Sequence, residues 1–127
     1  MTLPVSEKEL VCLLQIELAH LWMVRTFLKH ADEIQEDPEM LEVPRTLFDV
    51  IRATEPAFLE GDWARYLRKL KGKWGKLETA RDYYLAHFKD FSDHTNFAMA
   101  ASSLDGCLQK MNRLLTGASH SENGPAQ

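Results

Sequence analysis

Two side chains that could take part in catalysis stand six positions apart in the stretch 80–91, which reads ARDYYLAHFKDF. Arg81 carries a permanent positive charge and can bind a phosphate through two N–H donors. His87 is the side-chain type that ionises near neutral pH, so it can take a proton as a general base. Asp82 follows the arginine and can orient either group. Together these residue types can form a catalytic pair, in which a fixed positive charge accompanies a base.

The spacing of Arg81 and His87 restricts how one site can use both. Six residues along a regular helix correspond to about 600° of rotation and roughly 9 Å of rise, so the side chains point about 120° apart. A straight helix cannot direct both at one phosphate. Either the helix is broken near Tyr83, or two subunits bring their motifs together in a dimer cleft.

The same residues also have an ordinary structural interpretation. Arg81 can pair with Glu78 or Asp82 on a helix surface. His87 can be hydrogen-bonded between two helices, and the aromatic residues between them can pack into a core. On this interpretation the stretch has no chemistry of its own.

A block of basic residues precedes this stretch. Residues 1–60 contain 12 acidic and 5 basic side chains, whereas residues 61–127 contain 7 acidic and 10 basic ones. Such a block is usually a solvated helix face, but beside a catalytic site it can bind phosphates. The overall charge of −4 does not favour RNA binding. The candidate RNA-binding residues in the block are Arg65, Arg68, Lys69, Lys73 and Lys76.

A metal site is an alternative. The residues Glu17-Leu-Ala-His20 have the E-x-x-H form of di-iron bundles, but that class needs the motif twice, and it does not recur. A mononuclear zinc or iron site would instead combine histidines and carboxylates from several helices: Glu17, His20, His87, Asp90 and His94. A hydrogen-bonded pair of Glu17 and His20 in a partly buried seam is the competing explanation, because buried ionisable groups need partners. A catalytic pair of Arg81 and His87 needs no cofactor.

The elements that must position these residues are helices. Ser6 and Glu9 have the spacing of a capping box, which predicts a first helix from about residue 7 to the mid thirties. Pro38 and Pro44 interrupt it, and Pro44 suits the first turn of a second helix. Pro56 is expected to end or kink that second helix.

Two further helices follow. Asp62 is expected to cap a third helix over residues 63 to about 91, which contains both the basic block and the RDYYLAH stretch. Ser92 or Asp93 is expected to cap a fourth helix that reaches Leu115. Residues 117–127 have the composition of a disordered tail.

The fold class that these elements predict is all-α. No segment shows the alternating, β-branched pattern of a strand. We expect an up-and-down bundle of four main helices that forms a single domain over residues 1–116. The two cysteines, Cys12 and Cys107, are expected to be buried free thiols, although a disulfide between the first and last helices stays possible.

The first helix is apolar almost all round between Leu10 and Leu28. A small bundle cannot bury so much apolar surface alone, so we expect a homodimer formed through this helix. No apolar run approaches the ~18 residues needed to span a bilayer, and the N-terminus lacks a basic segment before an apolar one. We therefore expect a cytoplasmic protein without membrane contact.

The residues Arg81-Asp82 and Ala86-His87 resemble the R-x(4–6)-H signature of HEPN domains, and their RD…AH form is similar to an abortive-infection branch of that superfamily. The resemblance implies a metal-independent endoribonuclease of toxin or defence type that works as a dimer, with His87 as the general base and Arg81 stabilising the phosphorane. It also implies an RNA substrate and an antitoxin-like protein partner. Many domains of this fold keep the bundle and lose the nuclease, so a catalytically inactive HEPN-like protein or an unrelated helical interaction protein remains an alternative.

Overall fold

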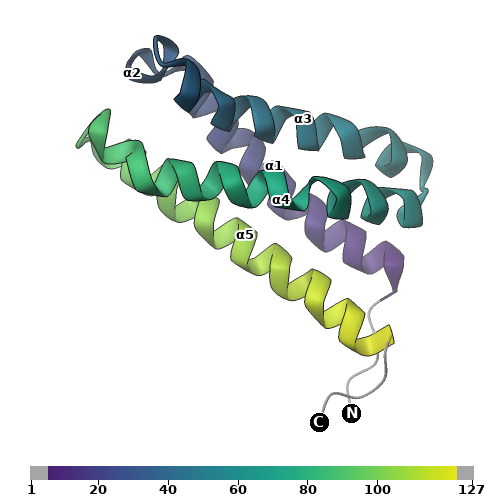
Figure 1. The fold of residues 1–127 in the computed structure, drawn as a ribbon. Coiled ribbons are helices and arrows are strands. Elements are labelled where there is room, and N and C mark those ends of the chain that lie inside the picture. The colour runs from purple at the N-terminus through teal and green to yellow at the C-terminus, as the bar shows by residue number, and fades with distance from the viewer. Residues whose placement is uncertain (1–5, 123–127) are drawn as a thin grey trace.

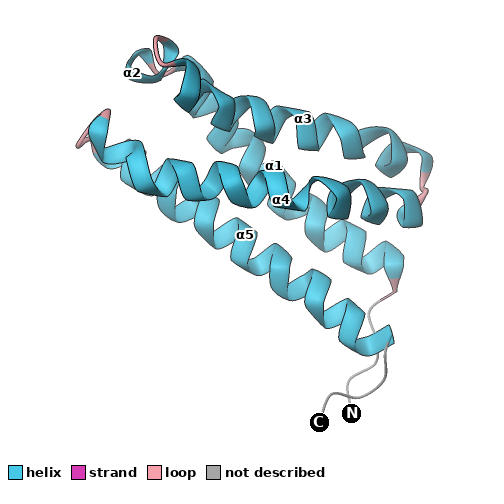
Figure 2. Cartoon of the chain, viewed as in Figure 1, coloured by secondary structure: helices cyan, strands magenta, loops and turns pink. Residues whose placement is uncertain are grey.

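The computed structural model describes residues 6–122, and the side chains of residues 6–117. No described residue lies in a strand (Figure 2), so the prediction of an all-α protein is confirmed. The elements are α1 (Glu7–His30), α2 (Asp32–Gln35), α3 (Pro38–Glu60), α4 (Trp63–His87), the 3₁₀-helix η1 (Phe88–Asp90) and α5 (Thr95–Glu122).

The four long helices form an up-and-down bundle in which α1 begins and α5 ends at the same end of the molecule (Figure 1). α1 lies against α3 and α5, and α4 lies against the same two helices. Within residues 6–122, α3 and α5 do not contact each other. The order around the bundle is therefore α1, α3, α4, α5, with one seam between each pair of neighbours.

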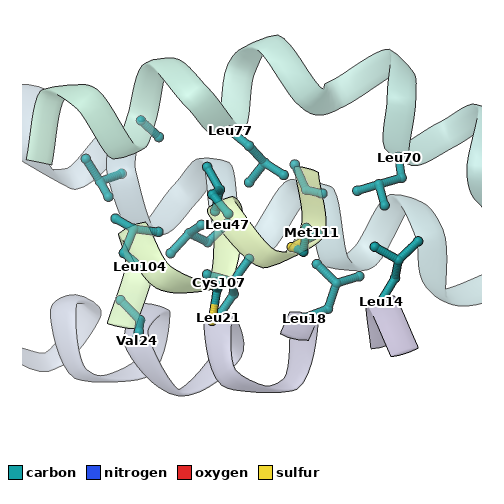
Figure 3. Packing of buried hydrophobic residues seen from close by; sticks show 14 of the residues in the cluster. Leu14, Leu18, Leu21, Val24, Leu47, Leu70, Leu77, Leu104, Cys107 and Met111 are labelled. Atoms are coloured by element: carbon teal, nitrogen blue, oxygen red, sulfur yellow. The ribbon is translucent and has the colours of Figure 1, made fainter. Parts of the chain in front are cut away.

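Leucine is the commonest residue in the core, and all four long helices contribute to it (Figure 3). Tyr66 and Tyr84 are the largest side chains that are fully buried. Each places its hydroxyl on a hydrogen-bond acceptor: Tyr66 donates to Gln15 Oε1 at 2.9 Å, and Tyr84 donates to the Phe97 carbonyl at 2.9 Å. The second bond ties the end of α4 to the start of α5.

The start of α1 agrees with the prediction from the sequence, and the start of α3, the second long helix, does not. Ser6 Oγ accepts the Glu9 amide at 3.1 Å, which confirms the predicted cap. The second long helix begins at Pro38 and not near Pro44, because Asp37 accepts the Met40 amide at 2.9 Å. Pro38 occupies the first turn, where a missing N–H costs nothing.

Both interior prolines of α3 are tolerated. The helix continues through Pro44 and Pro56 to Glu60, so Pro56, which was expected to end or kink it, does not end it. Gly61 ends it instead, with a φ of 70° in the left-handed region that glycine adopts without a steric cost. Asp62 then caps α4 as predicted, since its carboxylate accepts the Arg65 amide at 3.2 Å.

The turn between α4 and α5 differs from the prediction in two ways. α4 ends at His87 and is followed by η1, so it does not reach residue 91 as a continuous α-helix. The start of α5 is capped by His94, whose Nδ1 accepts the Asn96 amide at 3.1 Å. Ser92 is not the cap itself: its Oγ accepts the His94 amide at 2.9 Å, in the turn before α5.

The last helix is longer than expected. α5 continues past Leu115 to Glu122, so residues 117–122, which we expected in a disordered tail, are helical. The rest of that expected tail, residues 123–127, lies outside the described residues. The helix therefore continues past residue 116, which was predicted to be the end of the domain.

By length and composition alone, α1 is long and apolar enough to cross a membrane. This was not predicted, because the sequence of α1 contains no unbroken apolar run of the required length. In the bundle it is a core helix, with Leu14, Leu18 and Leu21 almost fully buried. The cytoplasmic location stays a prediction.

Candidate functional site

Arg81 lies on the side of α4 that faces α5. Its Nε donates to Asp82 Oδ1 at 2.9 Å, and one terminal nitrogen lies 3.7 Å from Asp105 Oδ1 on α5. Only 18% of its side chain is exposed. The guanidinium expected to bind a phosphate is therefore paired with two carboxylates and largely covered.

His87 lies on the other side of α4, toward α3. Its ring packs on that of Tyr83, with centroids 4.4 Å apart, and its Nδ1 lies 3.5 Å from Asp90 Oδ2. The Tyr83 hydroxyl in turn donates to Glu39 of α3 at 3.2 Å, and desolvation together with this bond raises the pKa of Tyr83. With 45% of its side chain exposed, His87 is accessible to a substrate, and Asp90 can orient its imidazole.

The structure does not bring Arg81 and His87 together within one chain. α4 is a regular helix up to His87, without a break near Tyr83. The two side chains therefore keep the separation of about 120° and roughly 9 Å that helix geometry gives. Of the two ways to use both residues, only assembly from two subunits remains.

The predicted RNA-binding residues all lie on α4 between Arg65 and Lys76, exposed or partly exposed, although Arg65 is paired with Glu60 at 2.8 Å. Lys69 and Lys76 fall within about 20° of His87 around the helix axis, so they share its side of α4. A groove of about 370 Å³ follows this seam, lined in part by Lys76, Thr79 and Tyr83. Its opposite wall carries the carboxylates of Glu39 and Glu42, which oppose an RNA backbone.

The structure does not bring the five candidate metal ligands together. No group of three potential metal ligands occurs among the described residues, which include all five candidates. Glu17 is buried and lies 3.3 Å from Lys110 Nζ, so its partner is this lysine and not His20, which is exposed. His87 and Asp90 pair with each other, and His94 caps α5.

The two cysteines differ in environment, and both are free thiols. Cys107 is buried as predicted, and burial followed by the nearby Glu17 carboxylate raises its pKa to about 11. Cys12 is exposed, so the expectation that it is buried was wrong. The sequence placed it in an apolar helix, but this part of α1 is apolar on its outer side as well.

That outer side belongs to a surface that we call the α1/α5 face. Ile16, Met23 and Met99 on it are 53%, 65% and 59% exposed. A groove of about 310 Å³ runs where the two helices meet. The face consists of Cys12, Leu13, Ile16, Ala19, His20 and Met23 of α1 with Asn96, Met99 and Ser103 of α5. None of these side chains carries a permanent charge.

The α1/α5 face lies across the bundle from the seam that contains His87, since α3 and α4 form the opposite pair of neighbours. A dimer formed through the first helix therefore does not place His87 within its interface. The sequence could not separate these two surfaces, because their positions depend on the order of the helices around the bundle.

Comparisons of the chain with protein-family models, with curated proteins and with solved structures find no match. The resemblance to HEPN domains thus depends on the short motif around Arg81 and His87 and on the helical outline.

Proposed function

We propose that the protein is a helical-bundle interaction module that forms a homodimer through the α1/α5 face. The observation that carries this proposal is the exposure of Ile16, Met23 and Met99 on the α1/α5 face. Apolar patches of this kind on small soluble domains mark association sites.

A second copy of the chain is the occupant that the chemistry favours. In a two-fold interface the same surface is used by both subunits, so charged residues near the axis meet charges of their own sign. The α1/α5 face limits this repulsion, because the permanent charges of Glu17 on α1 and Lys110 on α5 pair with each other at 3.3 Å and cancel. Large thioether and branched side chains can then pack against their own copies.

Sedimentation velocity tests this proposal. The wild-type protein should sediment as a dimer, and Ile16→Glu should sediment as a folded monomer, because it places a carboxylate pair in the interface. Leu59→Glu is the matched control, since Leu59 is 76% exposed near the end of α3 and lies outside the face. A wild-type protein that is monomeric at all accessible concentrations would refute the dimer.

A second candidate function is the metal-independent endoribonuclease that the HEPN resemblance implies, with its antitoxin-like partner. The observation in its favour is that accessible His87 has a carboxylate, Asp90, beside it and shares its side of α4 with Lys69 and Lys76. The carboxylate pairing of Arg81 speaks against it, because Asp82 and Asp105 occupy the guanidinium expected to stabilise the phosphorane.

RNA cleavage in the presence of EDTA tests this second candidate. A ribonuclease should cut a mixed RNA pool and leave 2′,3′-cyclic phosphate ends, and His87→Ala should abolish the cleavage. His30→Ala, an exposed histidine at the end of α1, is the control and should cleave normally. Cleavage that survives His87→Ala would come from a contaminant and would leave the interaction module as the only function proposed.

A further inference from the structure

A hollow of about 290 Å³ lies on the seam between α1 and α3, which is a different seam of α1 from the one that forms the α1/α5 face. Two kinds of side chain line it. The basic ones come from both helices and the apolar ones from α3: Arg25, Lys29, Leu41, Pro44, Arg45 and Phe48. A concave site that combines an apolar wall with a few converging polar groups is typical of small-molecule binding.

On this seam the Arg25 side chain lies over two aromatic rings and has a buried N–H group without an acceptor. Its guanidinium carbon lies 4.4 Å from the ring centroid of Trp22 and 5.0 Å from that of Phe48. Its Nε is buried and has no hydrogen-bond acceptor, and the described residues provide the side chain with no ion pair. A buried donor without an acceptor is uncommon in folded proteins, and an unseen ligand is one of its ordinary explanations.

The charges around the hollow favour a dianion. Arg25, Lys29 and Arg45 contribute three positive charges, and Glu42, which lies 2.6 Å from Arg45, contributes one negative charge. The balance is two positive charges, which matches a phosphate monoester near neutral pH better than a carboxylate. Arginine also binds phosphate oxygens through two parallel N–H donors, and lysine adds a point charge.

We propose that this hollow binds a phosphate monoester with a compact apolar body. The three basic side chains contact the phosphate, and the body packs against Leu41, Pro44 and Phe48. The volume restricts the ligand to a small body, because the hollow is at the lower end of the range for small-molecule sites. The proposal is independent of the dimer and of RNA cleavage, since it uses a separate seam.

Isothermal titration with phenyl phosphate tests the site, with phenol and inorganic phosphate as comparison ligands. Phenyl phosphate should bind saturably and at least about tenfold more tightly than either fragment, because only it uses both the charged and the apolar walls. Arg25→Met keeps the aliphatic length beside Trp22 and Phe48 but removes the charge, so it should weaken binding about tenfold or more.

Arg52→Met is the matched control. Arg52 also lies over the Phe48 ring, at 5.9 Å, but it is paired with Glu55 and does not line the hollow. It should keep the wild-type affinity, and circular dichroism should show that both variants are folded. An equal loss of affinity in the two variants would overturn the site.

A lipid headgroup can present the same monoester, so sedimentation with vesicles that contain phosphatidic acid forms a second arm. Vesicle binding that Arg25→Met abolishes would assign the phosphate to a lipid, whereas binding of phenyl phosphate alone would assign it to a soluble ligand. Either result supports the site. Absence of saturable binding in both arms would overturn it.

Discussion

The guanidinium of Arg81 on α4 lies 3.7 Å from the carboxylate of Asp105 on α5, and it also donates to Asp82 at 2.9 Å. This pairing connects two helices that have few other contacts, at a position where only 18% of the arginine side chain is exposed. Arg81 therefore has a structural role whether or not it takes part in chemistry.

We expect a double-mutant cycle of Arg81→Met and Asp105→Asn to show a coupling of about 0.5–1 kcal/mol in the free energy of unfolding, as for other partly exposed pairs. Urea unfolding at fixed protein concentration measures it. Arg113→Met, at an exposed position on α5, should show no coupling with Asp105→Asn. A coupling of zero for Arg81 would mean that its guanidinium is available for a ligand.

The ion pair of Glu17 and Lys110 makes a second prediction. Glu17 is buried beside the lysine, whose amine lies at 3.3 Å and remains exposed. Lys110→Met leaves the carboxylate buried without its cation, so we expect a loss of about 1–3 kcal/mol in urea unfolding. The double variant Glu17→Leu, Lys110→Met removes both charges and should recover most of that loss. A double variant less stable than Lys110→Met would contradict this account.

The helices could be predicted from the sequence wherever a local signal decides them. Ser6 and Asp62 cap α1 and α4 as expected, because a side-chain oxygen three residues before an amide is a contact within one turn. The start of α3 was misjudged because Asp37-Pro38 and Pro44 carry competing start signals. The cap at His94 was missed because imidazole is an uncommon capping group.

The candidate sites were harder to predict, because they depend on how the helices are ordered around the bundle. The motif of Arg81 and His87 was visible in the sequence, but the partner of Arg81, Asp105, lies 24 positions away. Arg25 and Arg45 meet only because α1 and α3 pack together. A single sequence contains no signal for such a contact, so the hollow on this seam could be found only in the structure.

Two adjacent tyrosines offer a matched comparison. The Tyr84 hydroxyl is buried and donates to the Phe97 carbonyl at 2.9 Å, whereas the Tyr83 hydroxyl reaches the exposed Glu39 at 3.2 Å. Tyr84→Phe leaves a buried carbonyl without its donor, so we expect it to lower the free energy of unfolding by about 1–2 kcal/mol. Tyr83→Phe should change it by less than about 0.5 kcal/mol, because water can replace the lost bond. Equal losses in thermal or urea unfolding would show that the buried bond to Phe97 contributes no more to stability than the exposed bond to Glu39.

Alkaline pH should destabilise the fold, because three buried side chains stay protonated in the folded protein but release their protons in the unfolded chain. Burial raises the pKa of the Cys107 thiol from 9.0 to about 11, and burial also raises the pKa of Tyr66 and Tyr84 above 10.0. In each case the folded protein keeps a proton that the unfolded chain releases, so the stability from these groups is fully present below the unfolded pKa and falls as pH rises through the window between the two values.

For Cys107 this window runs from pH 9.0 to about 11. One such group lowers the free energy of unfolding by at most about 1.4 kcal/mol per pH unit within its window. Urea unfolding across this range should therefore show stability falling with pH, and Cys107→Ala should show a smaller fall because one group has been removed. Cys12→Ala, at the exposed cysteine, should show the same fall in stability with pH as the wild type. A wild-type stability that stays constant across this window would contradict the buried, protonated state of Cys107.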